Sequence, residues 1–364
     1  MFDRRLVMNF DWVLLLTVVA LAGLGILNLY SATASWHAAT PIYLKQALWL
    51  GGGLGIALTI CLFDYRHLEY LAVHVYLVSS ALLVIVMVMG KTSMGATRWI
   101  DLGVFNLQPS EVVKIAVVLL FAKIFAETAH PSGFGLGELW KPALWLAVPV
   151  LLILKQPDLG TAVMVVAVAG SMLFFAGLKR GTILILVVLG LLTMVAGWFG
   201  LHDYQRARVM TFLNPEADPL GSGYHIIQSK IAVGSGGFLG KGFLQGTQSQ
   251  LSFLPERHTD FAFSVFAEEW GFAGGLFLLS GYIFLIVWGL YVARRAADRF
   301  GLFLAVGVTA MIFWHIVVNL VMVIGVLPVV WVPLPLFSYG GTSMVTTMIG
   351  VGLLMNVSMR RFKF

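Results

Sequence analysis

Long runs of hydrophobic residues, separated by short polar breaks, make up most of this chain. A helix needs about twenty consecutive apolar residues to cross a bilayer. The runs therefore predict an all-α polytopic membrane protein, with about ten transmembrane helices in a single transmembrane domain, residues 1–364. The predicted helices cover residues 12–30, 46–62, 71–89, 108–125, 142–154, 159–178, 182–200, 261–291, 300–326 and 339–359.

The pattern changes after the seventh predicted helix. Residues 202–260 are polar and rich in glycine, and they contain one helix-like segment, residues 223–233. A connection of this length is too long to be a simple linker. It is predicted to be a large extracytoplasmic loop between helices seven and eight. The polar segment 90–103 predicts a shorter interfacial loop.

Composition agrees with a membrane protein. The chain is 59% hydrophobic and 11% charged, with a mean hydropathy of +0.92, whereas soluble domains carry about 25% charged residues. The net charge of +6 needs no nucleic-acid partner, because cytoplasmic loops of membrane proteins are themselves rich in lysine and arginine. The one cysteine, Cys61, excludes an intramolecular disulfide. The first apolar run has span length and no cleavage-like end, so it is predicted to be an uncleaved signal.

The distribution of positive charge predicts the orientation. If the ten helices alternate in direction, thirteen lysines and arginines fall on the side of the termini and four in the short loops of the other side. The positive-inside rule then places both termini in the cytoplasm. The long loop faces outward, away from cytosolic nucleotides, which argues against a nucleotide-driven reaction there.

Residues 253–269 concentrate charge directly before an uncharged apolar run, residues 270–293. Asp260 lies there, at the boundary between an aqueous loop and hydrocarbon, just after Arg257 and His258. A carboxylate that is desolvated on one side and near cations on the other has the tuned pKa of a general base or a metal ligand. The alternative is a charged loop end that only marks the membrane surface.

Ionisable residues also occur where they are costly, within predicted helices. Glu111 and Lys114 are three residues apart and so share one face of the fourth helix. They either neutralise each other as a structural pair or line a polar cavity, and both can hold. Asp158 precedes the sixth helix and is predicted to be its N-cap, with a secondary electrostatic role in the cavity.

The long loop carries cations that are candidates for binding an anionic substrate. Solvated ion pairs are the simplest role for most of them. Arginines near a glycine-rich backbone can instead bind a diphosphate, because the guanidinium fork matches phosphate oxygens. The candidates are Arg206, Arg208, Lys241 and Arg257.

Several common catalytic motifs are missing from the sequence. The glycine cluster at residues 234–237 fits neither the phosphate-loop motif nor the dinucleotide fingerprint. No His/Cys spacing indicates zinc, and no G-x-S-x-G predicts a hydrolase triad. His315 and Asn319, four residues apart in the ninth helix, are predicted to make interhelical hydrogen bonds.

Near the C-terminus, Ser338-Tyr339-Gly340-Gly341, preceded by Pro333-Leu334-Pro335, resembles the signature of the SEDS family (shape, elongation, division and sporulation proteins). Other stretches agree, and together they extend the resemblance over nearly the whole chain. They are Arg98-Trp99-Ile100, Gln108-Pro109-Ser110-Glu111, Gln156-Pro157-Asp158-Leu159-Gly160, Tyr204-Gln205-Arg206, Gly223-Tyr224-His225-Ile226-Ile227-Gln228-Ser229 and Phe253-Leu254-Pro255-Glu256-Arg257-His258-Thr259-Asp260-Phe261. The chain is most similar to the rod-shape elongation members of the family.

The resemblance implies a peptidoglycan glycosyltransferase that polymerises lipid II on the outer face of the bacterial cytoplasmic (inner) membrane, during cell elongation and rod-shape maintenance. The implied partner is a class B penicillin-binding protein, which is a transpeptidase. The essential aspartate of the family's outer loop falls on Asp260. The other implied substrate-binding positions are Glu111, Lys114, Asp158, Ser338, Gly340 and Gly341. One departure is Trp331, where the family pattern has glycine, which leaves the local turn before the tenth helix open.

The implied chemistry gives Asp260 the role of a base that takes the proton of the acceptor hydroxyl. The departing lipid diphosphate then needs positive groups, such as Lys114, Arg206, Arg208 or a divalent cation (Mg²⁺ or Mn²⁺). Asp260 is also a candidate ligand of that cation, and the sequence does not separate base from ligand. The alternative functions are a transporter that flips lipid II and a scaffold that only recruits the transpeptidase.

Overall fold

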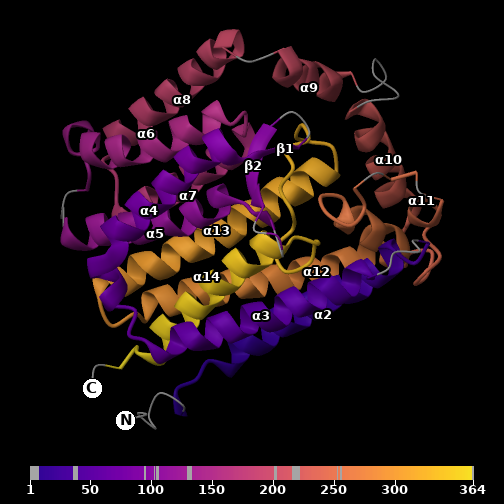
Figure 1. Ribbon diagram of the computed structural model, residues 1–364, viewed down its shortest axis with the longest axis horizontal. Helices are drawn as coiled ribbons and strands as arrows, with labels where there is room; N and C mark the ends of the chain where they lie inside the picture. The colour runs from indigo at the N-terminus through magenta and orange to yellow at the C-terminus, as the bar shows by residue number, and fades with distance from the viewer. Residues whose placement is uncertain are drawn as a thin grey trace.

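Helices dominate the computed structural model, and each predicted apolar run coincides with one of them (Figure 1). The structure describes residues 8–35, 40–93, 96–101, 103, 106–128, 133–200, 203–214, 222–251, 253–254 and 256–362. The long helices are α2 (Trp12–Ala32), α3 (Ile42–Leu62), α4 (His67–Met89), α5 (Pro109–Glu127), α6 (Trp140–Lys155), α7 (Leu159–Ala176), α8 (Arg180–Gly200), α12 (Ala262–Arg294), α13 (Arg299–Val323) and α14 (Gly341–Met359).

Eight of these helices, within the described residues, are long and apolar enough to cross a membrane. The other two are α5, which carries Glu111 and Lys114 near its start, and α6, which has only 16 residues. The chain is thus a multi-pass membrane protein, while the full count of ten spans stays a prediction.

The connections contain more regular structure than the sequence predicted. In the segment expected to be an interfacial loop, β1 (Lys91–Ser93) and β2 (Ala96–Asp101) join β3 (Asn106–Leu107) in a small antiparallel sheet, in the order β1-β2-β3. In the long loop, α10 (Ser222–Ser235) matches the predicted helical segment 223–233. Helices α9 (Asp203–Leu213) and α11 (Thr247–Gln250) and the 3-10 helix η1 (Leu136–Glu138) were not predicted.

Helix α5 runs through the interior of the bundle. It packs against α4, α7 and α13, and every residue from Pro109 to Ala122 except Val112 is buried. This burial encloses Glu111 and Lys114 in protein rather than in lipid, which is how an ionisable pair within a membrane helix is tolerated.

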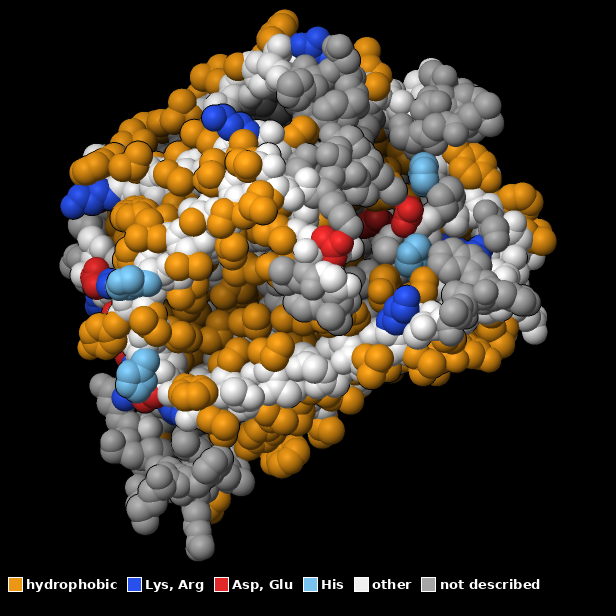
Figure 2. Space-filling model, viewed as in Figure 1, with side chains coloured by type: hydrophobic (Ala, Val, Ile, Leu, Met, Phe, Trp, Pro, Cys, Tyr) orange, Lys and Arg blue, Asp and Glu red, His pale blue; other side chains and the backbone are white. Residues whose placement is uncertain are grey.

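The two ends of the bundle are distinct. The terminal regions of the chain meet at one end (Figure 1), where the Ser358 hydroxyl donates a hydrogen bond to Asp11 over 2.6 Å. At the other end α2 finishes beside the start of α12, and Asn28 donates to the carbonyl of Ala262 over 2.9 Å. Asp260 therefore lies at the end opposite the termini. On the face in Figure 2, a broad hydrophobic band separates the charged groups near the termini from those around β2.

The long loop is fastened to α12 at a break in that helix. Gly271 has φ +63° and ψ −162°, a conformation that is essentially restricted to glycine, and it divides α12 into two halves. The N–H groups that open the second half donate to the loop, from Phe272 to Gly237 O over 2.9 Å and from Ala273 to Phe238 O over 3.0 Å. The loop backbone thus supplies the acceptors that the break removes.

Candidate active site

A polar cavity of about 140 Å³ lies where the starts of α5, α7 and α14 converge on the loops that carry Asp260 and Trp331. We call it the Asp260 pocket. Ligand pockets usually enclose about 300–1,000 Å³, so only the reacting end of a large substrate fits within this one. Acidic side chains line a recess beside β2 on the face shown in Figure 2.

Asp260 is only 5% exposed. Burial, assisted by the negative charge of Glu256, raises the pKa of its carboxyl from 3.8 to about 7, and a hydrogen bond from Thr259 opposes the rise. The Thr259 hydroxyl lies 3.3 Å from Asp260 Oδ2 and 3.1 Å from Glu256 Oε2, so its single proton can serve either carboxylate. A carboxyl group with a pKa near the working pH is suited to general acid–base chemistry.

Asn319 fixes the backbone on two sides of the pocket. Its Nδ2 donates to the carbonyl of Asp260 over 2.9 Å and to that of Val332 over 2.7 Å. Asn319 was predicted to bond to another helix, and this prediction was wrong. Its amide instead joins α13 to two loops. The backbone of Asp260 and the Trp331–Val332 segment are consequently held together.

Lys114 is positioned by two neighbours. Its Nζ lies 2.6 Å from Glu111 Oε1 and 2.6 Å from His315 Nε2. His315 Nδ1 lies 2.7 Å from the carbonyl of Met311, which assigns the ring proton to Nδ1 and leaves Nε2 as the acceptor. An ammonium group has three N–H donors, and no third acceptor lies at Nζ among the described residues. One donor therefore remains for a ligand, so the pair is structural and also lines the cavity.

The start of α14 presents its positive end to the pocket. Gly340, Gly341, Thr342 and Ser343 lie on the wall, and helical hydrogen bonding begins with the Met344 N–H donating to Gly340 O over 2.8 Å. The first N–H groups of the helix have no helical acceptor and favour an anion.

A side chain at position 341 would obstruct this arrangement. A Cβ built there lies 2.5 Å from the indole of Trp49. The glycine of the signature thus allows the start of α14 to approach its neighbour. Ser338 lies behind the wall, where its buried hydroxyl accepts from the Leu334 N–H over 3.1 Å.

Asp158 is the N-cap of α7, as predicted, because its Oδ1 accepts from the Thr161 N–H over 3.2 Å. Its Oδ2 accepts from the Thr161 hydroxyl over 2.9 Å and lies 3.8 Å from Arg98 Nε. Asp158 lines a smaller neighbouring cavity of about 50 Å³, whereas Thr161 lines the Asp260 pocket. Asp158 thus acts on the pocket through the residue that it caps.

Two predicted substrate-binding cations of the long loop are paired with groups of the protein itself. Lys241 pairs with Glu268 over 2.7 Å. Arg257 is 1% exposed and donates to the Ser249 carbonyl and, over 2.9 Å, to the Ser35 hydroxyl. In these positions they fold the loop, and their contact with substrate stays a prediction.

The other two loop arginines belong to α9. Arg206 donates to the carbonyls of Trp198 and Phe199 at the end of α8, over 3.2 and 2.8 Å, which is a favourable place for a cation. The side chain of Arg208 lies outside the described residues. Their predicted role in receiving diphosphate is not tested by these positions.

The pocket contains polar and aromatic groups that the sequence did not assign to it. They are Trp99, Gln108, Thr161, Thr259, His315, Trp331 and Tyr339. Gln108 precedes Glu111 by three residues, as Glu111 precedes Lys114. This spacing could have predicted from the sequence that Gln108 lies on the same side as the pair. The others come from separate elements, so only the tertiary fold brings them together.

A divalent cation is compatible with one pair of carboxylates, of which Asp260 lines the pocket and Glu256 does not. Among the described residues, no group of three or more His, Cys, Asp or Glu side chains forms a metal cluster. Mg²⁺, however, is commonly held by one or two carboxylates together with substrate phosphates. Asp260 and Glu256, both within reach of the Thr259 hydroxyl, are a donor set of that kind.

The chain is similar to known proteins over almost its whole length. Residues 11–363 match the family model FTSW_RODA_SPOVE, a cell cycle protein family. Peptidoglycan glycosyltransferase MrdB of Escherichia coli (strain K12) is 45% identical over 339 residues, which cover 92% of this chain and 91% of that protein. Peptidoglycan glycosyltransferase RodA of Treponema pallidum (strain Nichols) is 33% identical over 432 residues, which cover 98% and 99%.

Solved structures agree with this similarity. A chain from work on the structural coordination of polymerization and crosslinking by a peptidoglycan synthase complex superposes with a TM-score of 0.83 at 37% identity, covering 98% of this chain and 99% of that one. The crystal structure of the rod shape determining protein RodA of Thermus thermophilus gives a TM-score of 0.72 at 30% identity, covering 98% of each chain.

Proposed function

This chain belongs to the FtsW, RodA and SpoVE family of cell cycle proteins, and we propose that it joins sugars at the Asp260 pocket. It is a peptidoglycan glycosyltransferase, the activity by which its relatives are named. The observation that carries the proposal is a buried carboxylate that shares one cavity with an ammonium group and a helix N-terminus.

In the proposed reaction Asp260 acts as the general base. A hydroxyl of the acceptor sugar attacks the anomeric carbon of the donor sugar, and Asp260 takes the hydroxyl proton. A pKa of about 7 keeps a large fraction of the carboxylate ionised at neutral pH and still basic enough to accept that proton.

The leaving diphosphate is stabilised by positive groups. It departs as an anion, so it needs cations and N–H donors rather than the second carboxylic acid of a glycosidase. Lys114 offers its remaining N–H, and the start of α14 offers backbone N–H groups beside it. Glu111 and His315 hold the ammonium in place, so little reorganisation is needed as charge develops.

The substrate that we propose is lipid II, polymerised into glycan strands during cell elongation. Its undecaprenyl tail stays in the bilayer while its sugars reach the pocket at the end of the bundle opposite the termini. The excess of lysine and arginine on the side of the termini supports the proposal that the pocket lies at the outer face of the bacterial cytoplasmic membrane.

We also propose that a divalent cation, Mg²⁺ or Mn²⁺, binds together with the substrate. Asp260 and Glu256 would hold it, and it would neutralise charge on the diphosphate. A cation held by both carboxylate oxygens of Asp260 would leave neither free to accept a proton, so a strict dependence on the cation would favour the ligand role over the base role.

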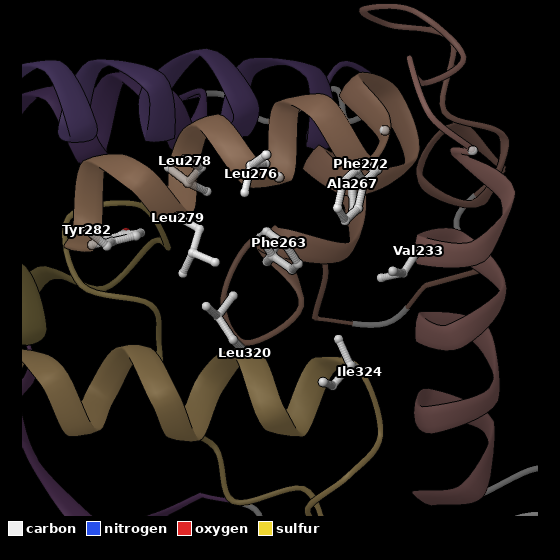
Figure 3. Close-up of a pocket in the computed structure, with 13 residues that line it drawn as sticks. Val233, Phe263, Ala267, Phe272, Leu276, Leu278, Leu279, Tyr282, Leu320 and Ile324 are labelled. Carbon is white, nitrogen blue, oxygen red and sulfur yellow. The ribbon is translucent and has the colours of Figure 1, made fainter. Parts of the chain in front are cut away.

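The partner that we propose is the crosslinking enzyme of a synthase complex, a class B penicillin-binding protein. An apolar cavity of about 390 Å³ lies between α10, α12 and α13, where Val233, Phe263 and Leu320 face one another (Figure 3). Gly237 and Gly275 also line it, and small residues let a second membrane helix approach closely. We assign this cavity to the membrane helix of the partner.

The test of the proposed reaction is Asp260→Asn in purified protein supplied with lipid II. The amide keeps the shape of the side chain and removes its basicity, so glycan formation should fall by about 10²- to 10⁴-fold. Asp101→Asn, an exposed aspartate outside the pocket, should retain normal activity. Polymer formation by Asp260→Asn at a near-normal rate would refute the role of Asp260.

The transporter is the alternative function, and the names of the relatives do not favour it. Vesicles that contain the protein and fluorescent lipid II separate the two activities. A glycosyltransferase converts lipid II into polymer, which is no longer recovered as monomer on extraction. A transporter instead moves intact lipid II across the bilayer. Transbilayer movement without polymer would reverse the assignment.

A further inference from the structure

Trp331 has a backbone conformation that a bulky residue rarely adopts. Its φ is +51°, in the left-handed region, where a side chain with a Cβ is strained and glycine is not. A strained residue persists where the surrounding structure or the function compensates for it, so the indole requires an explanation.

Trp331 lies at the junction of two cavities. Among the described residues, Trp331 is the one that lines both the Asp260 pocket and the smaller cavity of Arg98 and Asp158. His225 of α10 contacts it edge-on, with the ring centroids 6.2 Å apart. The following residue is held by Asn319, which also holds the backbone of Asp260. The backbone next to Trp331 is therefore held against that of Asp260, and His225 restrains the ring.

The chemistry of this wall suits a sugar ring. One side of the pocket offers the carboxylate of Asp260 and the ammonium of Lys114, which interact with hydroxyl and phosphate groups. The indole offers a rigid apolar surface that can pack against the C–H face of a pyranose. We propose that Trp331 is a saccharide-binding residue, which packs against the sugar that reacts at Asp260. The inference rests on the proposed function and names the contact that orients its substrate.

The test compares Trp331→Gly with Trp331→Phe in the polymerisation of lipid II. Loss of one aromatic contact should raise the KM of Trp331→Gly by about three- to tenfold, with kcat changed much less. Glycine adopts a φ of +51° freely, which offsets part of the packing against His225 that is lost with the indole, so Trp331→Gly should remain folded in thermal unfolding. Trp331→Phe keeps an aromatic face and should recover most of the affinity.

A matched control separates backbone strain from the lost ring. Leu244 has a φ of +64°, is 39% exposed and lies outside the Asp260 pocket. Leu244→Gly relieves the same kind of strain, so its KM should not change. An unchanged or lower KM in Trp331→Gly would overturn the proposal, because the indole would then only fill space. A KM that rises equally in both glycine variants would overturn it too.

Equilibrium binding of lipid II provides a readout that does not depend on turnover. The Asp260→Asn protein is compared with the double variant that also carries Trp331→Gly. A three- to tenfold weaker binding of the double variant, about the range expected for one aromatic contact, supports the saccharide contact even if Asp260→Asn remains active. That activity would refute only the base. Equal binding by the two proteins refutes the saccharide contact.

Discussion

The ionisation of Asp260 depends on the charge of Glu256, because both burial and this carboxylate raise its pKa to about 7. A general base must be deprotonated, so the wild-type rate should rise with pH through about 7. Glu256→Gln removes one cause of the raised pKa, and the rising limb should move to lower pH by on the order of one unit. The measurement is kcat/KM for glycan formation as a function of pH.

A control for this shift is Glu127→Gln, since Glu127 has a 60% exposed side chain and pairs with Lys123 at the far end of α5. This variant should leave the pH profile unchanged. A profile of Glu256→Gln that coincides with the wild type, or moves to higher pH, would assign the rising limb to a group other than Asp260.

His315 is a positioning residue for Lys114, which it meets at 2.6 Å. His315→Leu leaves a buried ammonium donor without an acceptor, which costs about 1–3 kcal/mol of stability. It also loosens the group that is proposed to stabilise the diphosphate, so kcat should fall by about 10- to 100-fold. His315→Gln restores an acceptor and should recover part of kcat. Equal kcat in the two variants would show that the imidazole does not act through a hydrogen bond.

At the scale of elements, apolar length was sufficient to predict the helices. The fourth predicted helix, residues 108–125, matches α5 closely, because a proline at its start and uninterrupted hydrophobicity are local properties. The break in α12 was not predicted, since the pattern of residues 261–291 indicates one continuous helix. Its cause is the contact of Gly271 with Gly240, which is distant in sequence.

The residues of the candidate site also fall into those that the sequence could predict and those that it could not. Asp260, Glu111 and Lys114 could be predicted because a charge next to, or inside, hydrocarbon is anomalous in the sequence itself. Lys241 and Arg257 have the same chemistry, but the fold turns them toward Glu268 and Ser249. Sequence alone does not distinguish a cation that binds substrate from one that folds a loop.

Gly271 gives a test of how the loop and α12 are joined. A Cβ there would lie 2.3 Å from Gly240 N and 2.7 Å from Phe238 O, so Gly271→Ala should destabilise the protein by about 2–4 kcal/mol. Glycan formation should fall with it, because the loop carries Asp260. The measurements are thermal unfolding in detergent and polymerisation of lipid II.

Gly275 on the same helix is the matched control, because a side chain at this position would have room. The nearest atom to a Cβ there is 3.6 Å away, in the ring of Phe263, and Gly275→Ala should be neutral or stabilising by up to about 1 kcal/mol. If the two alanine variants unfolded alike, the break at Gly271 would not be what holds the loop.

At the scale of the whole molecule, α12 and α13 separate two environments. His315 of α13 lines the Asp260 pocket, and Asn319 holds the backbone of Asp260, whereas Leu320 and Ile324 face the apolar cavity (Figure 3). A partner helix in that cavity would therefore press on the same two helices that position the base and Lys114. Packed helices transmit such contacts because the interior is close-packed, so binding of the crosslinking enzyme and glycan formation are expected to be coupled.

Gly275→Leu tests this arrangement. The larger side chain should fill the cavity and exclude a partner helix, so copurification with the class B penicillin-binding protein should fall by about tenfold or more. Glycan formation by the isolated chain should change little, because Gly275 lies outside the Asp260 pocket. Gly190→Leu adds the same bulk to α8, at an exposed glycine with open space around it, and should leave copurification intact. Normal complex formation by Gly275→Leu would move the partner to another surface, whereas equal loss in both variants would mean that added bulk on any membrane-facing helix disturbs the complex.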